Sequence, residues 1–234
     1  MSTPTDSKMI ALSRLLQFTD STFPVGTFSF SNGLETASFE NMVHDAETLK
    51  QLTWSQALQA AYSDGVAAIQ AHRAFLLGDY EQIAVADNML MLFKMNDEAR
   101  LMLKRMGKKF AELAAKLFED EIVTRWLKDI KDEKVPGTFP VAQGIAYAAA
   151  GVDEKALFCA HQYGVMNMVL SAALRCVKVS HYDTQKILFD LSEKVEELYA
   201  EASQMELKDM NAFFPELDIL ASLHEKGNMR MFMN

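Results

Sequence analysis

Cysteine and histidine, which often act as nucleophiles, bases or metal ligands, are sparse in this chain of 234 residues. Two cysteines, Cys159 and Cys176, are far apart in sequence, and the five histidines are scattered, with no His-x-x-x-His or Cys-x-x-Cys pair. On one continuous helix the cysteines would be separated by about 25 Å, which is too far for a disulfide. We expect free thiols, as in a reducing compartment, and no closed metal site. A site assembled across the fold from Cys159, His161 and His181 is the alternative.

A basic run at residues 104–109, KRMGKK, superficially resembles a phosphate-binding loop. Met102 stands where that loop needs its first glycine, and Lys109 stands where a hydroxyl residue should follow the lysine. No Gly-x-Gly-x-x-Gly occurs either, so we do not expect this chain to bind nucleotides. Because the run lies within a helical pattern, we interpret it as a solvated helix face or a protein contact.

The composition excludes two classes of partner. The net charge of −9 opposes binding to nucleic acid, which depends on Lys and Arg neutralising phosphates. Half of the residues are hydrophobic, yet the longest apolar runs, such as 146–150, fall short of the roughly 20 residues that span a bilayer. The polar N-terminus has no signal-peptide pattern. We expect a cytoplasmic protein with a flexible segment at residues 1–8 and no membrane or nucleic-acid partner.

Helical periodicity extends over nearly the whole chain. From residue 46 to 58, for example, Leu49, Leu52, Trp54 and Leu58 recur at helical spacing with charged residues between them. No run of residues indicates a strand. The sequence therefore predicts an all-α fold: a single-domain helical bundle of about ten helices over residues 1–234. The predicted helices are 9–19, 33–42, 46–62, 64–78, 80–92, 95–118, 139–150, 153–177, 184–204 and 216–224.

Two further local features concern helix ends and a charged connection. Asp45 and Asp153 are predicted N-caps, without a full capping box because Thr48 and Ala156 occupy the third position after them. The charged stretch Glu119–Lys134 is the best candidate for a surface excursion, and its Trp126 and Leu127 are compatible with a helix.

The opening segment from Phe23 to Glu35, FPVGTFSFSNGLE, is aromatic and rich in hydroxyls but nearly free of charge. Pro24 restricts its own φ, while Gly26 and Gly33 permit backbone geometry that other residues resist. Such a loop is either packed on its own core or covered by a partner. We predict that it is buried within the fold or at an interface.

Three separated blocks resemble the UreF-type urease accessory proteins. The first is the LLQ start at residues 15–17, followed by the pattern FPVGxFSxSxGLE at 23–35. The second is LSAALR at 170–175 before the DTQ turn at 183–185. The third is the ending, with PxLDI at 215–219, HE at 224–225 and RMF at 230–232. Thr27, Met231 and Asn234 depart from residues that are commoner in the family.

The resemblance implies a maturation factor with no catalytic activity of its own. UreF-type proteins are all-α homodimers that join a second accessory protein, UreD or UreH, and the GTPase UreG in delivering nickel to apo-urease. It implies no tightly bound cofactor, with nickel at most in transit, and it leaves any metal ligand unassigned. An alternative role is activation of the GTPase through an arginine finger, for which Arg175 is the candidate.

The same resemblance places partner-binding residues in the three blocks. We expect residues 225–234 to form a docking tail that folds back or binds UreD/UreH, anchored by Arg230, because Arg donates several hydrogen bonds and Met231 and Phe232 add burial. The candidate partner-binding residues are Phe23, Pro24, Gly26, Phe28, Ser29, Ser31, Gly33, Glu35, Arg175, Lys178, His224, Arg230, Met231 and Phe232.

Overall fold

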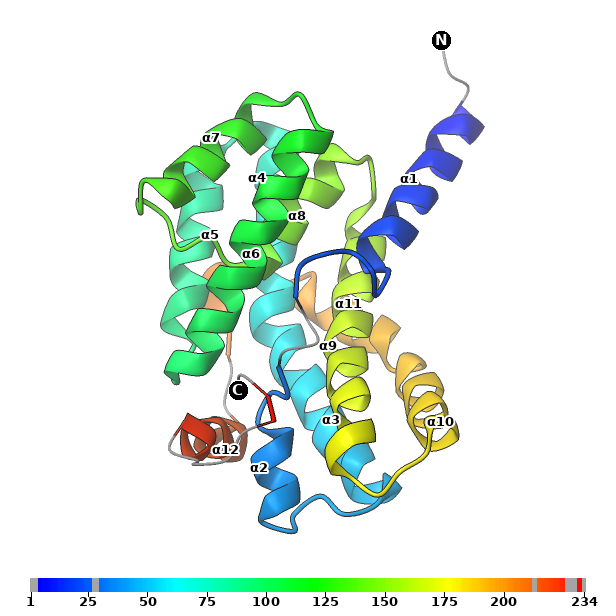
Figure 1. Cartoon of the computed structure of the whole chain (residues 1–234). Helices are drawn as coiled ribbons and strands as arrows, with labels where there is room; N and C mark the ends of the chain where they lie inside the picture. The colour runs from blue at the N-terminus through cyan, green and yellow to red at the C-terminus, as the bar shows by residue number, and fades with distance from the viewer. Residues whose placement is uncertain (1–3, 27–29, 212–213, 226–230, 233–234) are drawn as a thin grey trace.

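The helical periodicity of the sequence becomes a bundle of α-helices (Figure 1). The computed structural model describes residues 4–26, 30–211, 214–225 and 231–232, without the side chains of residues 4–7 and 224–225. Within these ranges no strand occurs, which confirms the all-α prediction. In chain order the elements are α1 (Pro4–Thr19), α2 (Leu34–Phe39), α3 (Ala46–Ala60), the π-helical η2 (Ala61–Gly65), α4 (Val66–Leu77), α5 (Tyr80–Leu92), α6 (Asp97–Leu117), α7 (Glu121–Lys131), α8 (Phe139–Ala149), α9 (Glu154–Cys176), α10 (His181–Ser192), α11 (Val195–Ala202), the 3-10 helix η3 (Leu207–Asp209) and α12 (Pro215–Glu225).

The core lies between α4, α8 and α9, with α6 packed against α8. Helix α8 is rich in alanine and is buried along most of its length, so neighbouring helices approach it closely. The Tyr147 ring of α8 stacks on Phe110 of α6, with centroids 6.4 Å apart, and packs at a tilt against Phe18 of α1, with centroids 5.4 Å apart. This aromatic cluster joins the start of the chain to the centre of the bundle.

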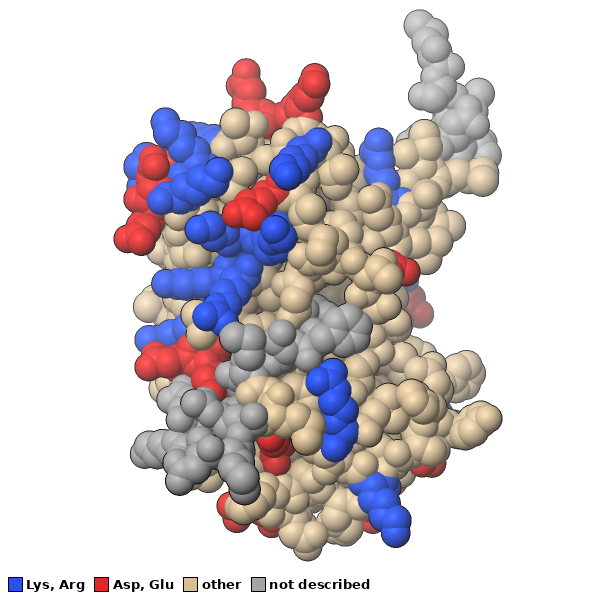
Figure 2. Space-filling view, in the orientation of Figure 1, with Lys and Arg blue, Asp and Glu red and all other residues tan. Residues whose placement is uncertain are grey.

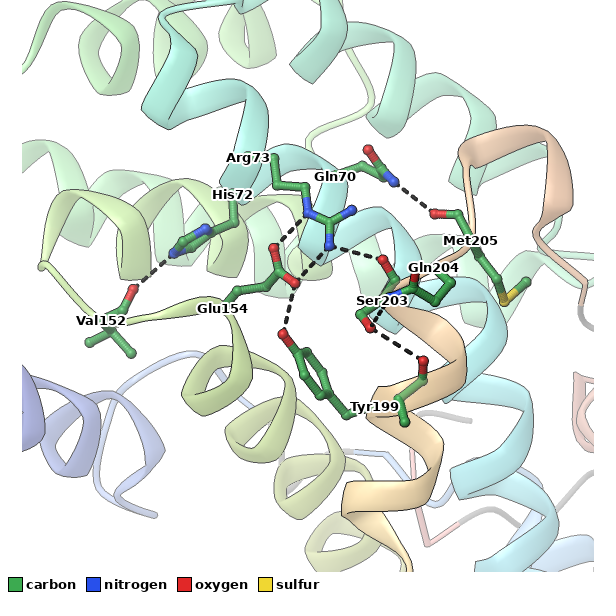
Figure 3. A network of polar contacts seen from close by, with 10 residues as sticks. Gln70, His72, Arg73, Val152, Glu154, Tyr199, Ser203, Gln204 and Met205 are labelled. Atoms are coloured by element: carbon green, nitrogen blue, oxygen red, sulfur yellow. Dashed lines mark hydrogen bonds and ion pairs between the residues drawn. The ribbon is translucent and has the colours of Figure 1, made fainter.

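A polar network fastens three helices on another side of the bundle (Figure 3). Arg73 of α4 donates from Nε and Nη2 to the two carboxylate oxygens of Glu154, at 2.6 and 2.8 Å, and also to the Ser203 carbonyl at 2.9 Å. The Tyr199 hydroxyl of α11 donates to the same carboxylate at 2.9 Å. A bidentate pair of this kind specifies orientation as well as proximity. It therefore sets the positions of α4, α9 and α11 relative to one another.

The N-caps follow the sequence, with one difference. Asp153 accepts a hydrogen bond from Ala156 N at 2.8 Å, as predicted. Asp45 accepts from Thr48 N at 2.9 Å, but the Thr48 hydroxyl also accepts from Asp45 N at 3.2 Å. The expectation that Asp45 lacks a full capping box was wrong, because a threonine hydroxyl reaches the backbone N–H that Glu or Gln usually satisfies.

The segment Glu119–Lys134, expected as a surface excursion, contributes to the body of the fold. Asp120 caps α7 by accepting from Ile122 N and Val123 N, at 2.8 and 3.0 Å. The indole of Trp126 is only 1% exposed, and Val123 lies one turn before it on the same buried face. A tryptophan covered to this extent makes α7 a core-forming helix.

The predicted helix over 184–204 is two helices. Leu191 at the end of α10 and Val195 and Leu198 in α11 are all buried, and both helices pack against α9. The Ser192 hydroxyl donates to the Phe189 carbonyl at 2.7 Å, a local bond that competes with helix continuation. The bend lets the apolar face follow α9. At the other end of the chain, α1 begins at Pro4, earlier than the expected start at residue 9.

Helix α9 is the one described helix that is long and apolar enough to cross a membrane, but 56% of its apolar window is buried inside the fold. Its composition thus matches its place in the core. Because α9 is continuous, it carries Cys159 and Cys176 on one helix, and both are free, as predicted.

Candidate functional site

Two residues near the C-terminus, Met231 and Phe232, contact the carboxylate of Glu35 in the first turn of α2. Glu35 Oε1 accepts a hydrogen bond from the Met231 amide at 2.7 Å, and Oε2 accepts one from the Phe232 amide at 3.1 Å. Each carboxylate oxygen thus accepts a hydrogen bond from one of two consecutive backbone N–H groups. These groups lie almost 200 positions later in the sequence than Glu35. Hydrogen bonds to a charged acceptor are stronger than those between neutral groups. Glu35 therefore holds the last residues that the structure describes.

The Phe232 side chain is buried against the end of α9. It is 6% exposed, whereas the neighbouring Met231 is 59% exposed. The guanidinium carbon of Arg175 lies 4.8 Å from the centre of the Phe232 ring, which is a cation–π contact. Among the described residues, Arg175 contacts this ring and forms no ion pair with a carboxylate.

Gly33 sets the approach of α12 to the start of α2. Its φ is +81°, in the left-handed region that favours glycine. A Cβ at this position would lie 3.3 Å from Leu220 Cβ and 3.4 Å from the Ala221 amide. A side chain would therefore push α12 away. We call the group of Gly33, Glu35, Arg175 and Phe232 the C-terminal clamp.

Two contacts fix the loop and α2 beneath the clamp. Asn32 and Gln56 exchange two hydrogen bonds. The Asn32 side-chain Nδ2 donates to Gln56 Oε1 at 2.9 Å, and Gln56 Nε2 donates to the backbone carbonyl of Asn32 at 2.7 Å. The Ser38 hydroxyl donates to the Cys176 carbonyl at the end of α9. Burial, together with the Glu35 charge, raises the pKa of the Cys176 thiol to about 11, so this cysteine is an unreactive thiol at neutral pH.

The start of the opening loop packs on the aromatic core. The Phe23 ring lies 5.4 Å from Phe18 and 5.2 Å from Phe110, measured between centroids. Phe30, further along the loop, is 4% exposed. Pro24 and Gly26 between them are exposed. The two ends of this loop are therefore anchored within the protein. Phe28 lies outside the described residues and Pro24 and Gly26 are exposed, so burial of the whole loop stays a prediction.

A cavity of about 170 Å³ extends from the clamp into the bundle. Apolar residues such as Phe30 and Met106 share its lining with polar ones, including Asp64, Lys94 and His161. Burial opposes ionisation of Asp64, but its ion pair with Lys94 outweighs burial and keeps the pKa of the carboxyl below its usual value.

The buried histidine in this cavity is neutral at physiological pH. The Nδ1 atom of His161 lies 2.8 Å from Gln143 Oε1, to which it donates, and Nε2 has no hydrogen-bond partner among the described residues. Burial lowers the pKa of His161 to about 4. In the described part of the chain, no three His, Cys, Asp or Glu side chains form a metal-binding group. Cys159, His161 and His181 are accordingly not brought together as a metal site.

The structure gathers some of the predicted site residues and separates others. Gly33, Glu35 and Arg175 meet Met231 and Phe232 at the clamp, with Ser31 fully buried beside α2. Phe23, Pro24 and Gly26 lie at the other end of the loop, and Lys178 is exposed beyond α9. Phe28, Ser29 and Arg230 fall outside the described residues, as does the side chain of His224.

Sequence reasoning missed the contacts that hold α12. Asn96 Nδ2 donates to Asp218 Oδ1 at 3.2 Å, which ties α12 to the start of α6. Burial raises the pKa of the Asp218 carboxyl. The LDI block at 217–219 had been noted as part of the family resemblance. Nothing in the sequence connected its Asp218 with Asn96, because these two residues are 122 positions apart.

Comparison with known proteins agrees with the resemblance in the three blocks. A sequence model described as UreF matches residues 43–192. The chain is 48% identical over 223 residues to the urease accessory protein UreF 2 of Brucella canis, covering 95% of this chain and 92% of that protein. It is 41% identical over 223 residues to the urease accessory protein UreF of Yersinia pseudotuberculosis, covering 95% and 98%. The chain therefore belongs to the UreF family of urease accessory proteins.

Proposed function

We propose that this chain is a nickel-insertion chaperone that joins the UreD/UreH accessory protein and the UreG GTPase while the nickel centre of apo-urease matures. Membership of the UreF family supports the role in urease maturation. The observation that carries the finer proposal is the C-terminal clamp. It draws residues from all three family blocks into one place and leaves Arg175 and Met231 exposed there. A preorganised surface of this kind lowers the entropy cost of binding a protein.

We propose further that the chain acts in the cytoplasm as a homodimer. In this proposal it has no catalytic role and no tightly bound cofactor, and nickel is cargo in transit. The relatives' names, which describe accessory proteins of urease, support a role beside the enzyme. The acidic net charge of −9 supports protein partners over nucleic acid, and no membrane partner is proposed.

Co-purification with each proposed partner tests this function. Tagged wild-type protein should retain UreD/UreH and UreG, and Phe232→Ala should lose UreD/UreH because the ring that seats the tail is gone. Phe189→Ala is the matched control, since that ring lies on α10 and is 67% exposed. The proposal is wrong if the wild-type chain retains neither partner, or if urease gains nickel equally well in cells that lack this chain.

A second candidate function is activation of the GTPase by Arg175. The guanidinium is exposed and contacts a ring rather than a described carboxylate, so it is available to a phosphate group that approaches the clamp. An arginine finger accelerates GTP hydrolysis by about 10³–10⁵. GTP hydrolysis by UreG should rise with the wild-type chain and not with Arg175→Lys, which keeps the charge but lacks the planar fork. Equal rates with both proteins would exclude this role.

A further inference from the structure

One face of α6 concentrates positive charge in an otherwise acidic chain. Six of the 23 Lys and Arg side chains fall within residues 100–116, where Glu112 is the single acidic residue. All six are exposed, and Figure 2 shows blue side chains gathered over α6. The α6 basic face consists of Arg100, Lys104, Arg105, Lys108, Lys109 and Lys116.

Several of these cations are not neutralised by a described carboxylate. Lys104 and Lys108 form no ion pair with any described carboxylate, and the Lys109 ammonium is 3.5 Å from Glu112. Arg100 Nε donates to the Lys94 carbonyl at 2.8 Å, which positions the guanidinium without cancelling its charge. The face therefore presents cations to solvent.

The spacing of these cations does not help the helix to form. Arg100, Lys104 and Lys108 follow one another at intervals of four residues, so they lie in a row on one side of α6. Like charges at this spacing repel and destabilise a helix. The row adds no apolar burial to the fold, because the opposite side of α6 supplies the buried residues, such as Met102 and Met106. We therefore expect its role in contacts outside the fold.

The helix that carries the row is rigidly seated. A Cβ at Gly107 would lie 2.0 Å from the Gly137 carbonyl oxygen, so the α6 backbone touches the loop before α8 directly. That loop is held in turn by the buried carboxylate of Asp87, which accepts from the amides of Gly137 and Thr138 at 2.6 and 2.8 Å. The basic row is thus a preorganised surface, and binding does not have to order it.

We propose that the α6 basic face binds a carboxylate-rich surface of a protein in the urease maturation assembly. Charge complementarity selects such a partner: a fixed row of exposed cations steers and orients an acidic protein surface. The remainder of this chain, with 17 basic and 31 acidic residues, would repel that surface, so docking is confined to α6. The face adjoins the clamp, because α12 packs against α6. This inference rests on the proposed function, since the partner comes from the same assembly.

Charge reversal tests the proposal with purified UreD/UreH, UreG and apo-urease, each titrated separately against the full-length chain. Lys104→Glu/Lys108→Glu should weaken one of these complexes at least tenfold and reduce its salt dependence. Lys131→Glu/Lys194→Glu is the matched control, because both lysines are exposed, unpaired with any described carboxylate and outside α6, and the change in net charge is the same. Thermal unfolding establishes that both variants remain folded.

Several outcomes would overturn the inference. Unchanged binding of all three proteins would show that the face is not used, and an equal loss in the control would show a net-charge effect only. A loss confined to self-association, or to binding of a DNA duplex, would assign the face to a second copy or to polyanions instead. If the wild-type chain binds none of the three proteins, the proposed function itself fails. Loss in Phe232→Ala but not in Lys104→Glu/Lys108→Glu would reject this inference alone.

Discussion

Replacing Glu35 by glutamine should release the C-terminal residues from the clamp and leave the helical bundle folded. The carboxylate accepts the Met231 and Phe232 amides with its two separate oxygens. Glutamine has almost the same shape, but only one of its terminal atoms is an acceptor. In the mutant, one backbone N–H therefore faces either an NH₂ group or solvent, and the remaining bond loses its charge assistance.

The structure sets the size of this effect. A hydrogen bond to a charged group contributes about 1.5–3 kcal/mol, and glutamine sacrifices roughly one such bond. A loss of about 2 kcal/mol in tail docking corresponds to roughly a 30-fold shift in the local equilibrium. The burial of Phe232, at 6% exposure, is unaffected by the substitution and keeps part of the docking energy. Global stability should change little, because the tail lies outside the α4, α8 and α9 core.

Amide hydrogen exchange measures this local equilibrium. Exchange at Met231 and Phe232 should be roughly 30-fold faster in Glu35→Gln than in the wild-type chain, by the same conversion from about 2 kcal/mol. Glu40→Gln is the control, since that residue is exposed at the end of α2 and makes no ion pair with a described residue. Equal protection of both amides in wild type and Glu35→Gln would refute the role assigned to the clamp.

Three further predictions concern the core, pH and assembly. Trp126→Ala should lower the free energy of unfolding by about 3–5 kcal/mol, because the indole is buried, and a change under about 1 kcal/mol in denaturant unfolding would contradict this. Burial lowers the pKa of His161 from 6.5 to about 4, so the unfolded state takes up the proton first and stability should fall as pH drops from 6.5 towards 4. Denaturant midpoints across that range test the slope, and His161→Gln should flatten it. Light scattering should report about twice the 26.3 kDa chain mass, and a monomer at every accessible concentration would exclude the proposed homodimer.

Local patterns in the sequence predicted most of the secondary structure. Apolar spacing identified most of the helices, since one buried stripe per helix is a property of nearby residues. Asp153 was identified as an N-cap because a cap also depends only on nearby residues: its carboxylate accepts from the amide three positions later. The errors arose where tertiary packing overrode local composition: charged residues around Trp126 concealed a core helix, and the helix over 184–204 bends to follow α9.

The motif blocks could be recognised from the sequence, but their contact with one another in the fold could not. Glu35 and Phe232 are separated by 197 positions, and no periodicity connects residues at that distance. Their contact exists because Gly33 lets α12 approach α2 and because Arg175, in the last turn of α9, lies over the Phe232 ring. Local propensity thus accounts for the helices, whereas the clamp depends on where the packed core places the ends of α2, α9 and α12.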